Sequence, residues 1–234
     1  MKKPEIEYLQ ANSTNMWDRN NNKIEYIVLH YVGAVSTAKN NAEYLHRDSN
    51  LGWSAHFFVD EHSIFQSVPL DKSAGHCGVD YSGGKAPYWG KCKNKNSIGI
   101  EMCCKIDSKG NWFIEPETVS KTLELVTWLM SVFGIDVDHV LRHYDVCWKT
   151  CPEPWVRNIG EWYDFIGRVK RRMNKPMEEW KVKAIEDAMK LGISDGTNPD
   201  NTCTRVEVMA MTSRAVEAAI KVMAEAINEA LKEV

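Results

Sequence analysis

The sequence contains no long hydrophobic run. No stretch approaches the roughly 18 consecutive apolar residues that a membrane-spanning helix needs, and 26% of the residues are charged. Lys2 and Lys3 lie at the start of the chain, but the apolar segment that follows such lysines in a secretory signal is missing. We therefore expect no membrane insertion, and we expect the protein to be made in the cytosol.

An excess of basic charge is also missing. The chain has 29 Lys and Arg residues against 32 Asp and Glu residues, with a net charge of −3. This balance argues against the basic surface that nucleic-acid-binding proteins present to phosphates. The acidic residues gather toward the C-terminus, where residues 177–234 contain 7 Lys and Arg against 11 Asp and Glu. The chain therefore has two parts of different character.

Regular cysteine spacing is the third absence. The cysteines number seven, which is odd, and they lack the paired spacing of a disulfide framework. Since we expect no secretory signal, we expect mostly reduced thiols. The cysteines are Cys77, Cys92, Cys103, Cys104, Cys147, Cys151 and Cys203.

Predicted strands and helices alternate over most of the chain, which predicts an α/β fold with a mixed central β-sheet flanked by helices. Ser36 is the expected N-cap of the first helix. Residues 71–96 form a glycine-rich loop whose aromatic side chains indicate that it packs as a binding loop. The predicted strands cover residues 24–30, 54–59, 63–69, 97–103 and 140–143, and the predicted helices cover residues 36–48, 116–133 and 155–172.

A basic, polar segment that ends in Pro176 indicates a domain boundary. We predict a larger domain over residues 1–172 and a linker over residues 173–177. The remaining residues, 178–234, form a smaller all-α domain.

The smaller domain is predicted to contain two helices, over residues 178–191 and from near Thr204 toward the C-terminus. Apolar residues of the second helix alternate spacings of four and three residues, a heptad-like seam that is typical of associating helices. The seam favours a homodimer, and the alternative is packing against the domain's own first helix. The seam residues are Met209, Ser213, Val216, Ile220, Met223, Ile227, Ala230 and Val234.

Two histidines and one cysteine form the strongest candidate site. His30 ends the first predicted strand, and His143 and Cys151 bracket a short segment after the last one. Zinc binds neutral imidazole nitrogens and thiolates that converge from different elements. Lys149, two residues before Cys151, is either an ordinary surface lysine or a group that stabilises an oxyanion. The combination predicts a zinc site.

Other combinations of these residue types remain open. His139 and His143 form an H-x-x-x-H pair, and His143, Cys147 and Cys151 would share one face of a continuous helix. An expected break at Asp145 argues against such a helix, and we expect His139 in an exposed turn.

The remaining histidines have different expected surroundings. His46 and His62 are predicted to be solvated, and His56, within an apolar strand, is predicted to be buried and hydrogen-bonded. His76 lies next to glycines that permit a close backbone approach, so it is a candidate for lining the site.

Glu101 is a charged residue within the apolar strand predicted over residues 97–103. Carboxylates are seldom buried without a partner, because burial raises their pKa and disfavours the charged form. One interpretation is a structural salt bridge. The other is a general base whose pKa is tuned toward neutral pH.

The stretches that carry these residues resemble, in the same order, the zinc-dependent N-acetylmuramoyl-L-alanine amidases, the family that includes phage endolysins and peptidoglycan recognition proteins. The resemblance covers residues 23–170. The matching stretches are Tyr26-Ile27-Val28-Leu29-His30, Ser54-Ala55-His56-Phe57-Phe58-Val59, Ala74-Gly75-His76, Asn96-Ser97-Ile98-Gly99-Ile100-Glu101 and His143-Tyr144-Asp145 through Lys149-Thr150-Cys151-Pro152.

The resemblance implies a role for each of these residues. It implies that His30, His143 and Cys151 bind Zn²⁺. It also implies that Lys149 stabilises the oxyanion and that Glu101 acts as the base. His76 and Trp89 are expected to bind substrate.

One position departs from part of the family. Some members carry a catalytic tyrosine immediately before the histidine of the His-Phe pair, where this chain has Ala55. The alanine fits the branch of the family that relies on the strand glutamate, which strengthens the assignment of Glu101.

The C-terminal part resembles one S-layer homology repeat, a module that anchors proteins to secondary polymers of bacterial cell walls. The resemblance rests on an Asp-Gly-Thr loop and on a Thr-Arg-x-Glu helix start. It implies that Asp195, Thr204 and Arg205 bind the wall polymer. Because such repeats usually act in threes, one repeat binds weakly unless chains associate and pool their repeats.

The favoured hypothesis is a phage-type endolysin that cleaves the amide bond between N-acetylmuramic acid and L-alanine in bacterial peptidoglycan. It would remain in the cytoplasm of the host bacterium until lysis and then act on the cell wall. The first alternative is a catalytically silent protein that only binds peptidoglycan. The second is a cysteine hydrolase that uses Cys151 or Cys77 with a histidine.

Overall fold

The computed structural model describes residues 1–174, 186–193 and 205–230, with side chains described for residues 209–224 of the last segment. The chain divides into two compact units, Lys3–Asn174 and Met1–Lys2 with Lys175–Val234. The division between Asn174 and Lys175 falls among residues 173–177, for which a linker was predicted. The function of each part stays a prediction.

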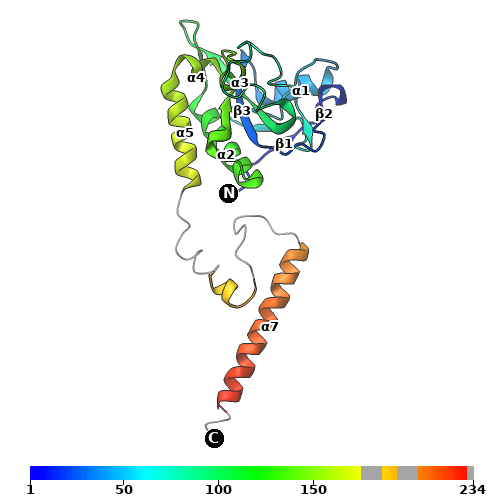
Figure 1. Cartoon of the computed structure of the whole chain (residues 1–234). Coiled ribbons are helices and arrows are strands. Elements are labelled where there is room, and N and C mark those ends of the chain that lie inside the picture. The colour runs from blue at the N-terminus through cyan, green and yellow to red at the C-terminus, as the bar shows by residue number, and fades with distance from the viewer. Residues whose placement is uncertain (175–185, 194–204, 231–234) are drawn as a thin grey trace. The chain divides into compact units, whose positions relative to one another are not determined.

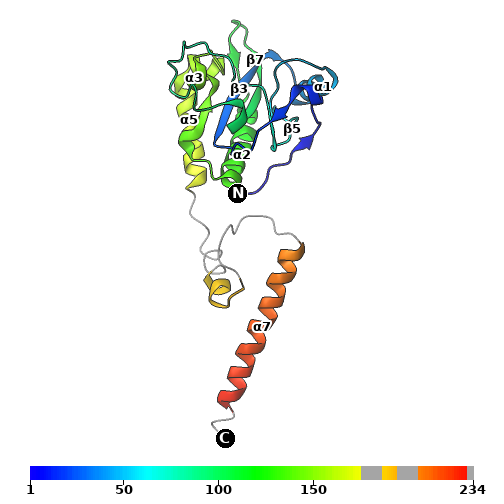
Figure 2. The same cartoon turned by 45° about the vertical axis from the view of Figure 1, so that its right-hand side comes forward.

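In the described part of the chain, a seven-stranded sheet forms the centre of the larger unit (Figures 1 and 2). Its order is β1-β5-β4-β7-β3-β9, and β8 pairs with β7. Parallel pairs (β3 with β7 and β9, β4 with β7) and antiparallel pairs (β4 with β5, β7 with β8) both occur, which confirms the predicted mixed sheet. The strands are β1 (Glu7–Tyr8), β3 (Tyr26–Val35), β4 (Phe57–Val59), β5 (Ile64–Gln66), β7 (Ser97–Ile106), β8 (Trp112–Phe113) and β9 (Val140–Arg142).

Other elements surround this sheet. A second sheet of two antiparallel strands is formed by β2 (Trp17–Asp18) and β6 (Lys72–Ser73). Short 3-10 turns are η1 (Ser13–Asn15), η2 (Asn94–Asn96) and η3 (Val137–His139). The helices are α1 (Ala38–Arg47), α2 (Pro116–Phe133), α3 (His143–Cys147), α4 (Glu153–Arg157) and α5 (Ile159–Met173).

One face of the sheet packs against α2 and α5. Ile27 and Leu29 of β3 and Ile100 of β7 are fully buried there. Each such side chain contributes about 1.5–3 kcal/mol by leaving water. Helix α2 ends as predicted at Gly134, whose φ of 65° is the left-handed conformation of a helix C-cap. This face is therefore the main hydrophobic core.

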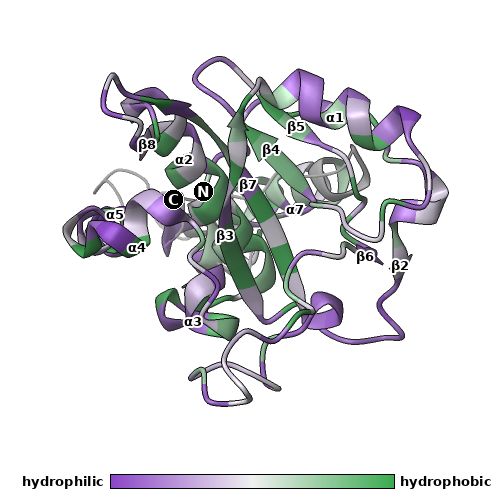
Figure 3. Ribbon diagram, turned by 90° about the horizontal axis from the view of Figure 1, so that it is seen from above, coloured by the Kyte–Doolittle hydropathy of each residue, from purple (hydrophilic) through white to green (hydrophobic). Residues whose placement is uncertain are grey.

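The opposite face of the sheet carries a polar strip between two smaller apolar clusters. Helix α1 covers one part through Ala42 and Leu45, which pack with Phe58. Residues 77–92 cover another part and pack on Tyr26. Figure 3 shows the hydrophobic strands β3, β4 and β7 at the centre and the more hydrophilic α1 and α5 at the periphery. The strip between the two clusters contains the polar residues of β3 and β7.

Two helix boundaries differ from the prediction. The N-cap of α1 is Thr37 rather than Ser36, because the Thr37 hydroxyl accepts a hydrogen bond from the backbone N–H of Asn40 at 3.1 Å. The helix predicted over residues 155–172 is two helices, α4 and α5. They are separated at Asn158, whose φ of −114° and ψ of 84° lie outside the helical region.

The last predicted strand ends one residue early, and His143 begins α3. The Asp145 carboxylate accepts hydrogen bonds from the backbone N–H of Arg142 at 2.8 Å and from its guanidinium at 2.7 Å. The expected break at Asp145 is therefore wrong, because this carboxylate stabilises the start of the helix instead. The helix ends at Trp148, which has a φ of 63°.

The second unit contains α7 (Arg205–Ala230) and a helical turn over residues 186–190. Helix α7 begins where a long helix was predicted. Its seam residues Met209 and Ile220 are 70% and 61% exposed. Asp195, Thr204 and the side chain of Arg205 lie outside the described residues, as does most of the helix predicted over residues 178–191.

The described residues contain no helix that could cross a membrane. None of the helices there combines the length and the apolar character that crossing a bilayer requires.

Candidate metal centre

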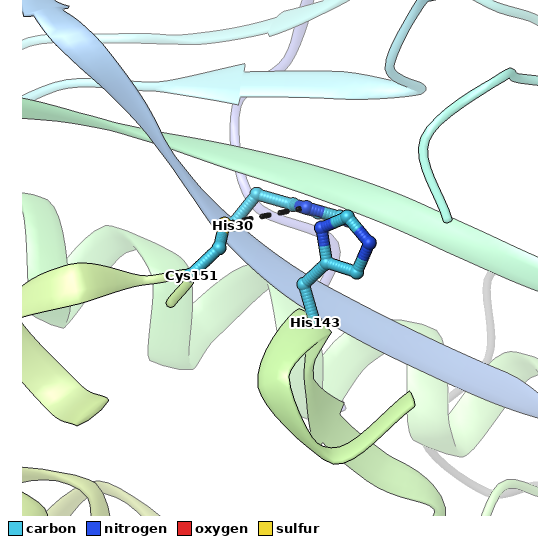
Figure 4. Close-up of side chains that lie close together, drawn as sticks. All are labelled: His30, His143 and Cys151. Carbon is cyan, nitrogen blue, oxygen red and sulfur yellow. Dashed lines mark hydrogen bonds between the residues drawn. The ribbon is translucent and has the colours of Figure 1, made fainter. Parts of the chain in front are cut away.

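His30, His143 and Cys151 point toward one another on the polar face of the sheet (Figure 4). His30 lies on β3, His143 is the first residue of α3, and Cys151 follows that helix. Their ligand atoms all lie within 4.8 Å of one another, and each residue is at most 4% exposed. The structure thus brings together the three residues predicted to bind zinc.

Backbone structure fixes where each of these side chains points. His30 lies in the middle of β3 rather than at a strand end, because β3 continues to Val35 after a register shift beyond Tyr31. The segment after α3 returns to the helix through a hydrogen bond from Tyr144 N–H to the Cys151 carbonyl at 2.9 Å. A strand, a helix start and this backbone hydrogen bond therefore position His30, His143 and Cys151, respectively.

Burial sets the protonation of the three groups. It lowers the pKa of His143 to about 3 and the pKa of His30 well below its ordinary value, and neighbouring histidines and Lys149 add to both effects. Both imidazoles are therefore neutral near pH 7, the form that binds metals. Burial raises the pKa of the Cys151 thiol, so this group ionises only when a cation compensates its charge.

Unpartnered polar atoms indicate that the arrangement fits a metal ion. Both ring nitrogens of His143 and Oε2 of Glu101 are buried without a hydrogen-bond partner among the described residues, although buried polar atoms nearly always have one. The Nδ1 atom of His30 lies 3.6 Å from Sγ of Cys151. Tetrahedral zinc with bonds of about 2.0–2.1 Å to nitrogen and 2.3 Å to sulfur separates two such ligand atoms by about 3.6 Å. The donor set and spacing fit zinc, with a fourth position left open.

Glu101 lies next to His30, because the two residues are paired across β7 and β3. Burial raises the pKa of the Glu101 carboxyl to about 8, and the charge of Lys149 opposes this shift. No ion pair reaches Glu101 within the part of the chain that the structure describes. The salt-bridge interpretation is therefore not supported, and a proton-accepting role is favoured.

Lys149 is exposed on the segment between α3 and Cys151. Its charge lowers the pKa of His30, His143 and Glu101 after the larger effect of burial, which places the ammonium close to the site. An exposed ammonium on this segment is available to a ligand that carries negative charge.

The two residues expected to bind substrate lie in different surroundings. Nδ1 of His76 is 3.0 Å from Nε2 of His30, and Nε2 of His76 is 3.0 Å from the Ser97 hydroxyl, so both ring nitrogens have partners within the protein. Trp89 lines a separate cavity of about 380 Å³ together with Cys77 and other loop residues, but with none of the three candidate ligands. Substrate binding by His76 and Trp89 stays a prediction.

The remaining histidines are not part of the centre. Nδ1 of His56 accepts a hydrogen bond from Gly99 N–H at 3.0 Å, and this ring is fully buried as predicted. His139 lies in η3 and is half-buried, with its ring centroid 4.6 Å from that of Tyr26, rather than in an exposed turn. His46 and His62 are exposed, as expected.

The rival arrangement of Cys147 with His143 and Cys151 is not formed. The Cys147 thiol instead lies 3.7 Å from the backbone carbonyl of His143 and donates to it. Because α3 ends before Cys151, the three residues do not share a helical face.

Two residues near the centre carry a signal that the sequence analysis left unused. The Ser97 hydroxyl is hydrogen-bonded to Nε2 of His76. A Cβ atom on Gly99 would lie 2.6 Å from Cγ of the same ring. Both residues precede Glu101 by multiples of two and therefore share its face of the strand. The spacing in Ser97-Ile98-Gly99-Ile100-Glu101 was the available signal.

Comparison with known proteins identifies relatives of this chain. The protein-family profile described as N-acetylmuramoyl-L-alanine amidase matches residues 20–154. The amidase BlyA of Bacillus subtilis strain 168 is 33% identical over 159 residues, which is 64% of this chain and 42% of BlyA. A probable N-acetylmuramoyl-L-alanine amidase of Bacillus licheniformis is 36% identical over 122 residues, which is 50% of this chain and 31% of that protein.

The chain thus spans less than half the length of these two relatives. A solved structure of a PlyL mutant superimposes with a TM-score of 0.57 at 26% identity, covering 71% of this chain and 99% of that one. The larger unit therefore shares the fold of a solved protein over nearly that protein's whole length.

Proposed function

The chain belongs to the N-acetylmuramoyl-L-alanine amidase family, and on this premise we propose that it hydrolyses the amide bond between N-acetylmuramic acid and L-alanine in peptidoglycan, with Zn²⁺ as its cofactor. The observation that carries the proposal is the buried set of His30, His143 and Cys151 beside the unpartnered carboxylate of Glu101. All four residues lie within the segment that matches the family.

Zinc held by the three ligands would supply Lewis-acid polarisation of the attacking water and of the scissile carbonyl. Glu101 accepts the proton of the attacking water, since its carboxylate lies next to His30 in the sheet and has an oxygen without a partner. Glu101 then delivers this proton to the departing L-alanine nitrogen, which must leave as a neutral amine.

Lys149 stabilises negative charge that develops on the carbonyl oxygen of the substrate. Its side chain is exposed, and its charge lowers the pKa of the buried Glu101 carboxyl. Preorganised groups of this kind contribute about 3–4 kcal/mol to the stabilisation of a transition state. His76 and Trp89 are proposed to contribute to substrate binding.

We extend the proposal to the biological role of a phage-type endolysin, held in the cytoplasm of the host bacterium until lysis. The second unit would bind a secondary polymer of the cell wall through Asp195, Thr204 and Arg205. The exposed seam of α7 supports association into a homodimer, in which two weak repeats act together.

The amidase proposal is tested by dye release from purified cell walls with and without a chelator. We expect release that stops when metal is removed and returns when zinc is added. Mass spectrometry of the digest should show new amino-terminal L-alanine on free stem peptides and uncleaved glycan strands.

Three other outcomes would contradict the proposal. Wall binding without dye release would identify a silent recognition protein. Activity that survives chelation but is abolished by thiol alkylation would identify a cysteine hydrolase. Cleavage within the glycan or within the peptide would place the enzyme in another hydrolase class.

A further inference from the structure

A chain of hydrogen bonds runs from the candidate metal centre to the protein backbone. Sγ of Cys151 is 3.6 Å from Nδ1 of His30, and Nε2 of His30 is 3.0 Å from Nδ1 of His76. Nε2 of His76 is 3.0 Å from the Ser97 hydroxyl. That hydroxyl donates to the carbonyl of Lys93 at 2.7 Å.

The backbone carbonyl determines the direction of every bond in the chain. The Lys93 carbonyl can only accept, so the single hydroxyl proton of Ser97 points to it, and the Ser97 oxygen accepts from His76. A neutral imidazole has one N–H and one lone pair. In the neutral form of His76 the proton is therefore on Nε2, and its Nδ1 accepts from the Nε2–H of His30.

This order leaves the lone pair of His30 on Nδ1, the atom that faces Cys151. We propose that His76 and Ser97 are positioning residues that hold His30 in the tautomer whose Nδ1 is free to bind the metal. The inference rests on the proposed function, since it concerns a ligand of the proposed zinc site, and it assigns to His76 a task in addition to the proposed contribution to substrate binding.

Packing and hydrogen bonds fix the position of the His76 ring. Gly99 leaves the space that the ring occupies, because a Cβ atom there would lie 2.6 Å from Cγ of His76. The backbone N–H groups of His76 and Cys77 both donate to Oδ1 of Asn94, at 3.1 and 2.8 Å. The backbone hydrogen bonds to Asn94, the packing against Gly99 and the hydrogen bonds at both ring nitrogens therefore fix the ring in its orientation.

Outer partners of metal-binding histidines fix the tautomer and the ring orientation, and their loss typically costs about 10–100-fold in metal affinity. His143 provides an internal contrast, because neither of its ring nitrogens has a hydrogen-bond partner in the part of the chain that the structure describes. The protein therefore orients His30 through hydrogen bonds before a metal binds, and it does not do so for His143.

The test combines zinc affinity with imidazole NMR on the full chain. Zinc affinity is measured by competition with a chromophoric chelator. We expect Ser97→Ala and His76→Phe to bind zinc about 10–100-fold more weakly than the wild type. Ser97→Thr, which keeps the hydroxyl, should restore the wild-type affinity.

Ser67→Ala is the matched control, because Ser67 is fully buried and its hydroxyl has no hydrogen-bond partner within the described ranges. It should leave zinc affinity unchanged. Long-range ¹⁵N–¹H spectra of the metal-free protein should show the Nε2–H tautomer for both His30 and His76. In Ser97→Ala the His76 signals should shift toward a mixture of tautomers.

Two results would overturn the inference: an Nδ1–H tautomer of His30 in the wild type, or wild-type zinc affinity in folded Ser97→Ala and His76→Phe. If His76→Phe does not fold, the zinc affinities of Ser97→Ala, Ser97→Thr and Ser67→Ala and the wild-type spectrum still test the inference. A chain that binds zinc with the expected tautomers but releases no dye would contradict the proposed function and leave this inference standing. If the wild type releases dye but Ser97→Ala and His76→Phe bind zinc as tightly as it does, this inference is contradicted and the proposed function stands.

Discussion

At the scale of single residues, the two side chains proposed for catalysis, Glu101 and Lys149, differ in their exposure to solvent. The carboxylate of Glu101 has a buried oxygen without a partner, whereas Lys149 is exposed. Burial raises the pKa of Glu101 to about 8, so this carboxyl holds and releases a proton near neutral pH. The exposed ammonium of Lys149 is instead proposed to act electrostatically.

The first prediction concerns the proton acceptor. Glu101→Gln keeps the size of the side chain but cannot accept a proton from water, so kcat should fall by about 10²–10⁴-fold. Zinc content, measured by metal analysis, should equal that of the wild type. Full dye release by zinc-loaded Glu101→Gln would contradict the role of this residue.

The second prediction concerns the stability of the metal-free protein as a function of pH. The pKa of Glu101 is about 8 in the folded chain against an ordinary 4.5, so below pH 4.5 the carboxyl is protonated in both states. As pH rises toward 8, the unfolded chain releases this proton first, and the free energy of unfolding falls. The limiting loss is about 4–5 kcal/mol.

Glu101→Gln has no carboxyl that titrates at this position. Its free energy of unfolding should therefore not show the loss caused by Glu101 as pH rises. Urea unfolding in the presence of a chelator measures both proteins at several pH values. We expect the variant to gain stability relative to the wild type between pH 4.5 and 8. A constant difference between the two proteins across this range would contradict the environment assigned to Glu101.

At the scale of elements, the register of β3 and β7 determines the site. His30 pairs with Glu101, so a ligand and the proton acceptor lie side by side on adjacent strands. Shifting either strand by one residue would turn its site residue into the core. Their largely apolar sequences made both strands predictable, but the pairing of these two strands depends on the whole sheet.

The third prediction concerns the start of α1, beside the same face of the sheet. Oδ2 of Asp60 accepts from Ala38 N–H at 2.7 Å, and Oδ1 accepts from the backbone N–H groups of His62 and Ser63 at 2.8 and 2.7 Å. These hydrogen bonds lower the pKa of Asp60 against the opposing and larger single effect of burial.

Asp60→Ala leaves these N–H groups without their acceptor and should lower the free energy of unfolding by about 3 kcal/mol. The control is Glu43→Ala on the exposed side of α1, where the ion pair to Lys39 spans 3.8 Å. This change should cost less than about 1 kcal/mol. Equal effects of the two substitutions in urea unfolding would show that Asp60 does not hold the helix start.

At the scale of the whole molecule, the larger unit contains every residue proposed for the chemistry. His30, Glu101, His143, Lys149 and Cys151 all lie within Lys3–Asn174, which forms a compact unit by itself. The similarity to the PlyL mutant also concerns a protein that this chain covers over 99% of its length. The chemistry should therefore be separable from the second unit.

The fourth prediction is that a fragment of residues 1–174 folds and binds zinc. Its thermal unfolding should be cooperative, and its zinc affinity should match that of the full chain, because no ligand is removed. Circular dichroism and chelator competition measure both properties. Loss of cooperative unfolding would show that the second unit is required for folding.

The fifth prediction concerns self-association through α7. Ile220 on the seam and Val222 off it are 61% and 54% exposed. A charge within a helix–helix seam is strongly unfavourable, so Ile220→Glu should abolish the dimer and Val222→Glu should retain it. Sedimentation velocity at several concentrations measures the change. A monomeric wild type, or equal behaviour of the two variants, would contradict the dimer.

The sequence by itself determined the α/β fold class, most of the strands and helices, and the residues that meet at the candidate centre. Periodicity predicted the elements, because apolar side chains must face the core at intervals set by backbone geometry. The types of the site residues were informative because few side chains bind zinc or accept protons. The break at Asn158 and the short helix at His143 were missed, since both depend on local hydrogen bonds that periodicity does not contain.

Only the tertiary structure decided which neighbours those residues have. The link from His30 through His76 to Ser97 joins side chains separated by 46 and 21 positions in the chain. Likewise, the raised pKa of Glu101 follows from the groups that exclude water around it. Hydrogen-bond direction and desolvation depend on distances of a few ångströms between distant segments, and these distances exist only after the sheet has formed.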